Sequence, residues 1–140
     1  MRITTRGRYG LRAMIELARH RGPTPLMMGE IARALGISRK YLHAQLRSLK
    51  DEGLVTSVRG SAGGYHLTRP ASEITVAEII SALEGCDSLV DCVEDPEACD
   101  RCNECITRGL WRDLGKVIQS YLSGITLQDL AARKSSRART

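Results

Sequence analysis

The sequence predicts a mainly α-helical protein with one small β-hairpin, and three observations carry this prediction. Apolar residues recur at the helical spacing i, i+3, i+4, i+7 through most of the 140 residues. A glycine-rich stretch, GSAGG at 60–64, separates two short runs of strand-like composition. A last apolar stripe continues for over four helical turns near the C-terminus. The expected architecture is a winged helix-turn-helix followed by a long C-terminal dimerisation helix.

The first helix is expected to begin after Thr4 or Thr5 and to continue to about His20. Arginines lie off its apolar stripe, and Pro23 and Pro25 end the helical pattern. The expected buried face consists of Leu11, Met14, Ile15 and Ala18.

The next segment predicts two helices joined by a tight turn. A short helix over about 28–35 ends at Gly36, which can adopt the left-handed conformation of such a turn. Ser38 suits the N-cap of a second helix over about 39–52, which Gly53 closes. Its inward residues are Leu42, Leu46 and Leu49, so its outward face is basic and comprises Arg39, Lys40, His43 and Arg47. This pattern is typical of a helix-turn-helix, although plain helical hairpins share the spacing.

A hairpin follows the second helix directly, in the position of a wing. The run LVTSVRG predicts a strand, GSAGG a turn, and YHLT the returning strand, which Pro70 stops. Arg59, Gly60 and Ser61 lie at the tip, where glycines let the backbone approach a partner and an arginine could enter a minor groove or contact phosphates. The alternative is a hairpin whose glycines serve only the turn.

The C-terminal half predicts two more helices. Residues 74–85, ITVAEIISALEG, have an apolar side formed by Val76, Ile79, Ile80 and Leu83. The later stripe comprises Leu110, Leu114, Val117, Ile118, Tyr121, Leu122 and Ile125. At 1.5 Å per residue it corresponds to roughly 27 Å of helix. A 70-residue half cannot easily bury so much apolar surface, so pairing with a second copy through residues 110–122 is expected. Packing onto its own winged helix is the alternative.

The distribution of charge also divides the chain into two halves. Residues 1–70 hold thirteen Lys or Arg against four Asp or Glu, a net of +9, whereas residues 71–133 have a net of −7. A basic half indicates nucleic acid, because Lys and Arg that neutralise phosphates release counterions. We therefore expect a DNA-binding domain over 1–70, a cysteine loop and dimerisation helices over 71–133, and a disordered basic tail over 134–140.

Localisation is predicted by what the sequence lacks. No apolar run approaches the ~18 residues of a membrane span. The stretch MRITTRGRYG has no apolar run behind it, as a signal peptide would. A cytoplasmic protein is expected, in which clustered cysteines more often bind metal or do redox chemistry than form structural disulfides.

Four of the five cysteines fall within CVEDPEACDRCNEC, residues 92–105, with the spacing C-x6-C-x2-C-x2-C. Cys92, Cys99, Cys102 and Cys105 are the candidate metal ligands, because thiolates on one loop can converge on a soft metal or an iron–sulfur cluster. All three histidines lie in the other half, so a local site depends on thiolates, which a nearby carboxylate could complete. A structural zinc site and a disulfide or redox thiol switch are the competing interpretations.

Several distinctive motifs follow one another along the chain. They are RITTRGRYGLRAM, IARALGISRKYLHAQLRSLKDEGLV, SVRGSAGGYHLTRP, ITVAEIISALEG and CITRGLWRDL continuing to ITLQDL. Their order resembles that of the Rrf2 family of bacterial winged-helix regulators. The resemblance covers about residues 1–131. It implies a homodimer held by the long C-terminal helix, with one winged helix per subunit offered to a palindromic DNA site. It also implies three cysteines that ligate a [2Fe-2S] or [4Fe-4S] cluster, and these map onto Cys92, Cys99 and Cys105.

Departures from the family pattern leave the fourth ligand open. The first cysteine gap is six residues rather than five, and Cys102 is an additional thiol. The family contains iron–sulfur cluster regulators of the IscR type and nitric-oxide sensors of the NsrR type. Arg108 stands where IscR-type members place a histidine ligand. The N-terminal TTRGRYG lacks the aspartate ligand of NsrR-type members. Cys102 is the candidate fourth ligand, with Glu104 or Asp100 behind it. The remaining cysteine, Cys86, is expected to be a buried bystander.

These observations predict a homodimeric, sequence-specific DNA-binding transcription regulator that senses redox state, nitric oxide or iron–sulfur status. The expected cofactor is an iron–sulfur cluster, [2Fe-2S] rather than [4Fe-4S], with zinc as the alternative. A winged-helix regulator with structural zinc or a thiol switch, responding to a metabolite or protein partner, is the second hypothesis. An enzyme is not expected, because no nucleophile has an adjacent base and no phosphate loop is present. The expected DNA contacts are Ser38, Arg39, Lys40, Tyr41, His43, Arg47, Arg59, Gly60 and Ser61.

Overall fold

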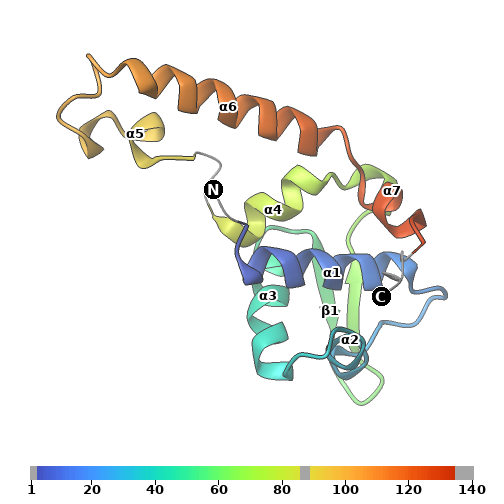
Figure 1. The fold of residues 1–140 in the computed structure, drawn as a ribbon. Coiled ribbons are helices and arrows are strands. Elements are labelled where there is room, and N and C mark those ends of the chain that lie inside the picture. Colours follow the sequence, from blue (N-terminus) through green and yellow to red (C-terminus); the bar gives the residue numbers. More distant parts are fainter. Residues whose placement is uncertain (1–2, 86–88, 135–140) are drawn as a thin grey trace, which may run out of the picture.

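The computed structural model describes residues 3–85 and 89–134 and confirms the predicted fold class (Figure 1). Its described part is mainly helical, with one two-stranded antiparallel sheet. In chain order the elements are α1 (Thr5–Arg19), α2 (Met28–Leu35), α3 (Arg39–Asp51), β1 (Val55–Val58), β2 (Gly64–Leu67), the 3-10 helix η1 (Ala71–Glu73), α4 (Val76–Glu84), α5 (Asp91–Glu94), the 3-10 helix η2 (Pro96–Ala98), α6 (Ile106–Ser123) and α7 (Leu127–Ala132). The expectations for Cys86 and for residues 135–140 concern residues outside the described part.

The first three helices agree with the predicted ones because their ends carry strong local signals. The side chain of Thr4 accepts a hydrogen bond from the Gly7 amide at the start of α1. Gly36 ends α2 with φ of 67°, in the left-handed region. The Ser38 hydroxyl then accepts the Tyr41 amide at 3.1 Å and caps α3. The helix-turn-helix is therefore set by residues close together in sequence.

The hairpin is the predicted wing, with small differences at its ends. β1 pairs with β2 from Val55 opposite Leu67 to Val58 opposite Gly64. The second strand begins at Gly64, a residue that the sequence placed in the turn. The backbone of Tyr65 exchanges hydrogen bonds of 2.9 and 3.1 Å with Leu26, so the base of the wing is fixed to the segment before α2.

The core lies between α1, α3 and α4, with contributions from the wing and α7. It contains the expected inward residues of α3, all 0% exposed, and those of α4 except Ile80, which is half-buried. On α1 the most buried apolar side chains are Ala13, Met14 and Leu17, so the buried face is turned slightly from the predicted one. The fully buried set also includes Ile31, Ile74 and Leu127.

Two similar stretches of sequence meet at the N-termini of α4 and α7. The stretches are ITVAEI at 74–79 and ITLQDL at 125–130, and Thr75 and Thr126 form an isolated antiparallel bridge. The amide of Val76 donates to the Ile125 carbonyl at 2.9 Å, and the amide of Leu127 donates to the Ile74 carbonyl at 2.8 Å. We call this pair of segments the threonine bridge. It joins the segment directly after α6 to the start of α4.

Each threonine of this bridge also begins a helix with a reciprocal cap. Thr75 accepts from the Glu78 amide, and the Glu78 carboxylate accepts from the Thr75 amide at 2.8 Å. Thr126 and Asp129 make the same exchange. Burial acts to raise the pKa of Glu78, but hydrogen bonds from Thr75 and Arg69 outweigh it and hold the pKa below its ordinary value. Hydrogen bonds from Thr126 likewise lower the pKa of Asp129.

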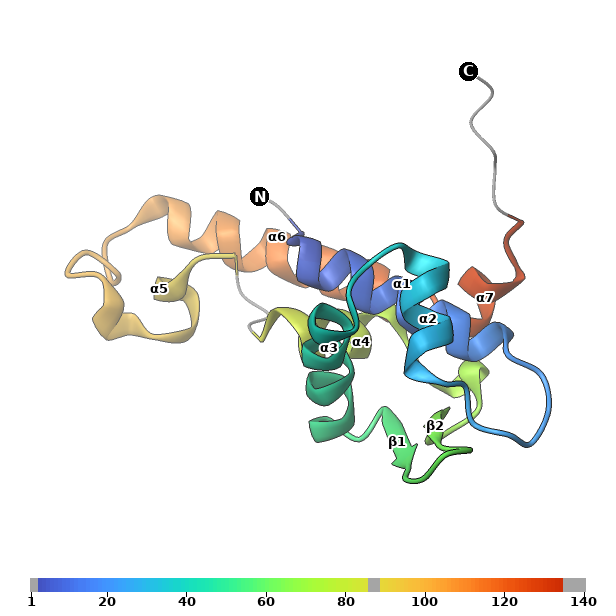
Figure 2. The same cartoon turned by 90° about the horizontal axis from the view of Figure 1, so that it is seen from below.

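The long helix α6 extends away from the winged helix, together with the cysteine segment (Figures 1 and 2). It ends at Ser123, so the prediction that the helical stripe includes Ile125 is wrong, and Ile125 lies in the connection to α7. No residue of α6 is buried. Its large apolar side chains include Ile106, Tyr121, Val117 and Leu110, which are 95, 68, 64 and 57% exposed. Leu114, Ile118 and Leu122 are half-buried, and α6 packs against α4.

The cysteine segment contains two short helical turns, α5 and η2, where the sequence predicted only a loop. Among the described residues, no helix combines the length and hydrophobicity needed to cross a membrane.

Candidate functional sites

The outer face of α3 is a basic surface exposed to solvent. Lys40, His43 and Arg47 are exposed, and the leucines on the opposite face of the helix are fully buried. The exposure of these basic side chains follows from the 3.6-residue helical period, since burial of the leucine face of α3 turns the opposite face towards solvent. The N-terminal turns of such a helix can enter a DNA major groove.

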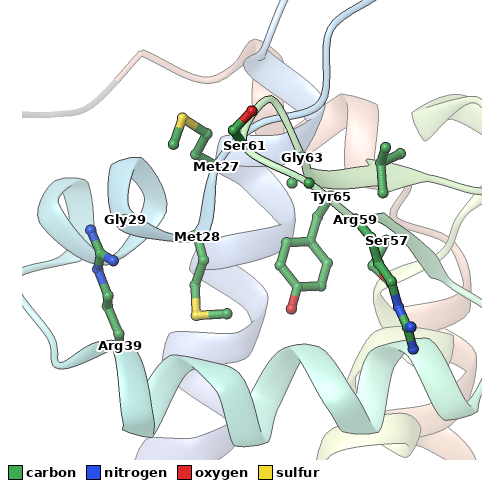
Figure 3. Close-up of a pocket in the computed structure, with 12 residues that line it drawn as sticks. Met27, Met28, Gly29, Arg39, Ser57, Arg59, Ser61, Gly63 and Tyr65 are labelled. Carbon is green, nitrogen blue, oxygen red and sulfur yellow. The ribbon is translucent and has the colours of Figure 1, made fainter.

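Arg39 is exposed, as predicted, and its side chain also contacts α2, whereas Tyr41 is only half-exposed and contacts α1. Arg39 reaches from the first turn of α3 towards Gly29 at the start of α2 (Figure 3). A Cβ added at Gly29 would lie 2.5 Å from an Arg39 Nη atom, so the absence of a side chain there makes room for the guanidinium. Tyr41 is half-buried on the flank of α3 that faces α1.

A hollow of about 350 Å³ lies between α2, α3 and the wing (Figure 3). Arg39, Arg59 and Ser61 contribute polar groups to its lining, and Met28 and Tyr65 contribute apolar surface. Burial raises the pKa of Tyr65 above its ordinary value. Gly60 and Ser61 are exposed at the tip of the wing, as predicted from the sequence.

A second hollow, of about 330 Å³, lies between α3 and the wing and is lined by His43, Arg47, Lys50, Ser57 and Tyr65. Lys50 donates from Nζ to the Ser57 hydroxyl at 2.7 Å and so connects α3, which would be the recognition helix of a helix-turn-helix, to β1. The sequence prediction missed Lys50, although it follows Arg47 by three residues and continues the basic face. The two adjoining hollows thus bring together six of the nine predicted residues and leave out Ser38, Lys40 and Tyr41. The six are Arg39, His43 and Arg47 of α3 and Arg59, Gly60 and Ser61 of the wing.

The four cysteines of the loop differ in exposure. Cys102 is 6% exposed, Cys92 is half-buried, and Cys99 and Cys105 are exposed. Burial raises the pKa of Cys102, and the neighbouring Cys92 acts in the same direction. A contact of 3.2 Å between Cys105 Sγ and Thr107 Oγ1 lowers the pKa of Cys105.

Arg108 closes the loop onto α6. Its Nε donates to the Cys92 carbonyl at 2.8 Å, and the same carbonyl lies 3.7 Å from Cys102 Sγ. No sequence signal indicates this contact, because the two residues are 16 positions apart and the acceptor is a backbone carbonyl. Arg108 therefore fixes the backbone of Cys92, one of the candidate ligands, to α6.

The chemistry of the donor set fits a soft metal or an iron–sulfur cluster, since four thiols and no imidazole lie in this part of the chain. The geometry is not preassembled. Across residues 3–85 and 89–134, no three His, Cys, Asp or Glu side chains converge as a metal site. To share one group, the exposed Cys99 and Cys105 would have to turn towards Cys92 and Cys102.

The fold, the basic face of α3 and the adjoining wing define a winged-helix DNA-binding protein. The family model for Rrf2, described as an iron-dependent transcriptional regulator, matches residues 3–133. The chain therefore belongs to the Rrf2 family, as its motifs predicted, and is a DNA-binding transcription regulator rather than an enzyme.

Individual relatives agree with this assignment. The HTH-type transcriptional regulator IscR of Xenorhabdus nematophila is 42% identical over 130 residues, which cover 93% of this chain and 79% of that protein. The structure of CymR, the global cysteine regulator of B. subtilis, has a TM-score of 0.77 and 37% identity, and the match covers 96% of this chain and 99% of CymR. The structure of T. potens IscR has a TM-score of 0.75 and 34% identity, and the match covers 100% of this chain and 94% of that one.

Proposed function

We propose that the protein is a homodimeric regulator that binds a palindromic operator and senses redox state, nitric oxide or iron–sulfur status through its cysteine loop. The quartet Cys92, Cys99, Cys102 and Cys105, placed at the N-terminal end of α6, is the observation that carries the sensor function. A thiolate-held iron–sulfur cluster, [2Fe-2S] in preference to [4Fe-4S], would supply the redox chemistry. The family's description as iron-dependent supports the same proposal.

The exposed stripe of α6 supports the homodimer. Ile106, Leu110, Val117 and Tyr121 are all more than half exposed, although they recur on one face of a helix. Burying one such side chain stabilises a protein by about 1.5–3 kcal/mol, and in a two-fold dimer each contact occurs twice. Pairing of α6 with its copy would remove this apolar surface from water.

The DNA contacts are divided between α3 and the wing. Lys40, His43 and Arg47 are proposed to face the major groove, while Arg59 contacts the minor groove or its phosphates. Ser38 can accept the Tyr41 amide and still donate its own hydroxyl proton to a phosphate.

The wing assignment is tested by Arg59→Ala, with Arg112→Ala as the matched control. Both variants lose one exposed arginine, but Arg112 lies on α6 beside Asp113. Binding is measured on a duplex from the protein's own promoter region at several salt concentrations. Arg59→Ala should weaken binding and reduce the salt slope by about one, and Arg112→Ala should change neither. If Arg59→Ala leaves affinity and slope unchanged, the wing assignment is wrong.

The sensor function is tested by the visible spectrum and the iron, sulfide and zinc content of protein purified without oxygen. A coloured protein with stoichiometric iron and sulfide is expected, and single Cys→Ser replacements then identify the ligands. A colourless protein that carries zinc would make the loop a structural zinc site. A coupling of about 1–3 kcal/mol between loop and operator would change operator affinity about 5- to 150-fold.

A thiol switch is the second candidate, favoured by the closeness of Cys102 to Cys92 and by the likeness to CymR, a global cysteine regulator. In such a switch, two thiols lose two electrons and two protons as a disulfide forms, and a peroxide is reduced to two waters. Mass spectrometry of metal-free protein treated with hydrogen peroxide would identify the pair. A metal-loaded protein whose thiols resist peroxide would rule this candidate out.

A further inference from the structure

Two tyrosines and an arginine connect α1 to the first turn of the recognition helix. The rings of Tyr9 and Tyr41 meet edge to face, with centroids 6.1 Å apart and planes at 87°. The guanidinium carbon of Arg12 lies 5.3 Å from the centre of the Tyr9 ring, within range of a cation–π contact. The two tyrosines are half-buried and Arg12 is exposed.

Tyr41 is fixed at its backbone and at its ring by different partners. Its amide donates to the Ser38 hydroxyl at 3.1 Å, which sets the start of α3. This cap does not determine the direction of the ring, because a tyrosine has two side-chain torsions. The T-shaped contact with Tyr9 determines the direction of the Tyr41 ring, since aromatic pairs favour that arrangement.

The position of Tyr41 suits a phosphate rather than a base. By helical geometry Tyr41 is turned about 100° from Lys40, and its ring lies against α1. Tyrosine hydroxyls commonly donate to phosphate oxygens, and such contacts fix the register of a protein on DNA. A ring held in one direction presents its hydroxyl without an added loss of side-chain freedom on binding.

We propose that Tyr9 is a positioning residue for DNA binding, which orients the Tyr41 hydroxyl towards the phosphate backbone beside the major groove, and that Arg12 acts through Tyr9. This inference rests on the proposed placement of α3 on DNA. A purely structural role of Tyr9 in the packing of α1 on α3 is the competing explanation.

The chain offers a control for that explanation. Arg6 of α1 donates from Nη2 to the Ser48 hydroxyl of α3 at 2.8 Å, two turns from Tyr41. Ser48→Ala therefore removes a different contact between the same helices and leaves the tyrosine pair intact. It should not change operator affinity if only the orientation of Tyr41 matters.

The experiment measures the affinity of each variant for a promoter duplex and for a scrambled duplex. The variants form a double-mutant cycle of Tyr9 and Tyr41. Tyr9→Leu should weaken promoter binding by about 2- to 13-fold, the range expected for an edge-to-face pair. Tyr9→Phe, which keeps the ring, should bind like the parent protein. In a Tyr41→Phe background, which lacks the hydroxyl, Tyr9→Leu should have no further effect. The effect of Arg12→Ala should likewise disappear in the Tyr9→Leu background.

Additive losses from Tyr9→Leu and Tyr41→Phe, or an equal loss from Ser48→Ala, would overturn the positioning role. Thermal unfolding of each variant shows whether a loss of binding reflects unfolding. If the parent protein prefers neither duplex, the proposed DNA interface itself fails, and that failure is separate from the failure of this inference.

Discussion

Gly10 lies where α1 and α4 approach so closely that a methyl group has no room. A Cβ added at Gly10 would lie 2.4 and 2.5 Å from the two Cδ atoms of Leu83 and 3.0 Å from its Cγ. Leu83 is 1% exposed and belongs to the core of the winged helix. The substitution Gly10→Ala therefore tests whether this close approach exists in solution.

Two opposing effects decide the magnitude of that substitution. Alanine is more favourable than glycine within a helix by about 1 kcal/mol, so at an open position the change would stabilise. Here the end of the Leu83 side chain would have to move by about 1 Å to reach ordinary contact. Overpacking of this kind costs about 1–3 kcal/mol. The expected net effect is a destabilisation of about 0–2 kcal/mol.

The matched control is Gly115→Ala in α6. No atom lies within 4 Å of a Cβ added there, and Gly115 is on the opposite side of the helix from the exposed apolar stripe. This variant should gain about 1 kcal/mol in the free energy of unfolding, measured by urea denaturation at a fixed protein concentration. Gly10→Ala should thus be less stable than Gly115→Ala by about 1–3 kcal/mol. Equal stabilisation of both would refute the close packing of α1 on α4.

Three further outcomes are expected. Gln45 is 2% exposed and its Oε1 has no hydrogen-bond partner among the described residues. Gln45→Met should therefore raise the free energy of unfolding by about 1 kcal/mol in urea denaturation. A lower free energy of unfolding would show that this oxygen is hydrogen-bonded in solution. Val117→Glu should shift the proposed dimer to monomer in sedimentation equilibrium, whereas Gln119→Glu, an equal change of charge on the other side of α6, should not. The lowered pKa of Glu78 means that its contribution to stability is complete above the ordinary value of 4.5 and is lost as the pH falls through the lower folded value. Glu78→Gln should therefore flatten the pH dependence of unfolding in that acid range, and an unchanged profile would contradict the capping role.

The sequence predicted the helix-turn-helix well because its signals are local. The left-handed Gly36 and the capping Ser38 lie within three residues of each other and determine the ends of two helices. The basic face of α3 followed from the burial of the leucines opposite. Residues whose side chains turn towards other elements could not be assigned in this way. Arg39 lies over α2 and Tyr41 lies against α1, and neither contact leaves a pattern in the sequence.

The C-terminal half was less predictable because long-range contacts decide it. The apolar stripe continues without interruption to Ile125, yet the helix ends at Ser123, two residues before the threonine bridge begins. That bridge pairs Thr126 with Thr75, which is 51 positions away in the sequence. The arrangement of the four thiols depends likewise on how the loop folds, so their spacing identifies candidate ligands but does not predict their geometry.

The connections of α4 suggest how the proposed sensing by the cysteine loop would act on α3. At its C-terminal end, Glu84 accepts hydrogen bonds from the amide and the hydroxyl of Thr4, at 3.0 and 2.8 Å, just before the chain enters the cysteine region. At its N-terminal end, Thr75 is joined to Thr126, where the chain returns from α6. Both ends of the region that carries the cysteines and the proposed dimer contact are thus fixed to one helix. Because α4 also packs directly on α1 and α3, a shift of α4 by the loop would reach the recognition helix through packed side chains rather than a flexible linker.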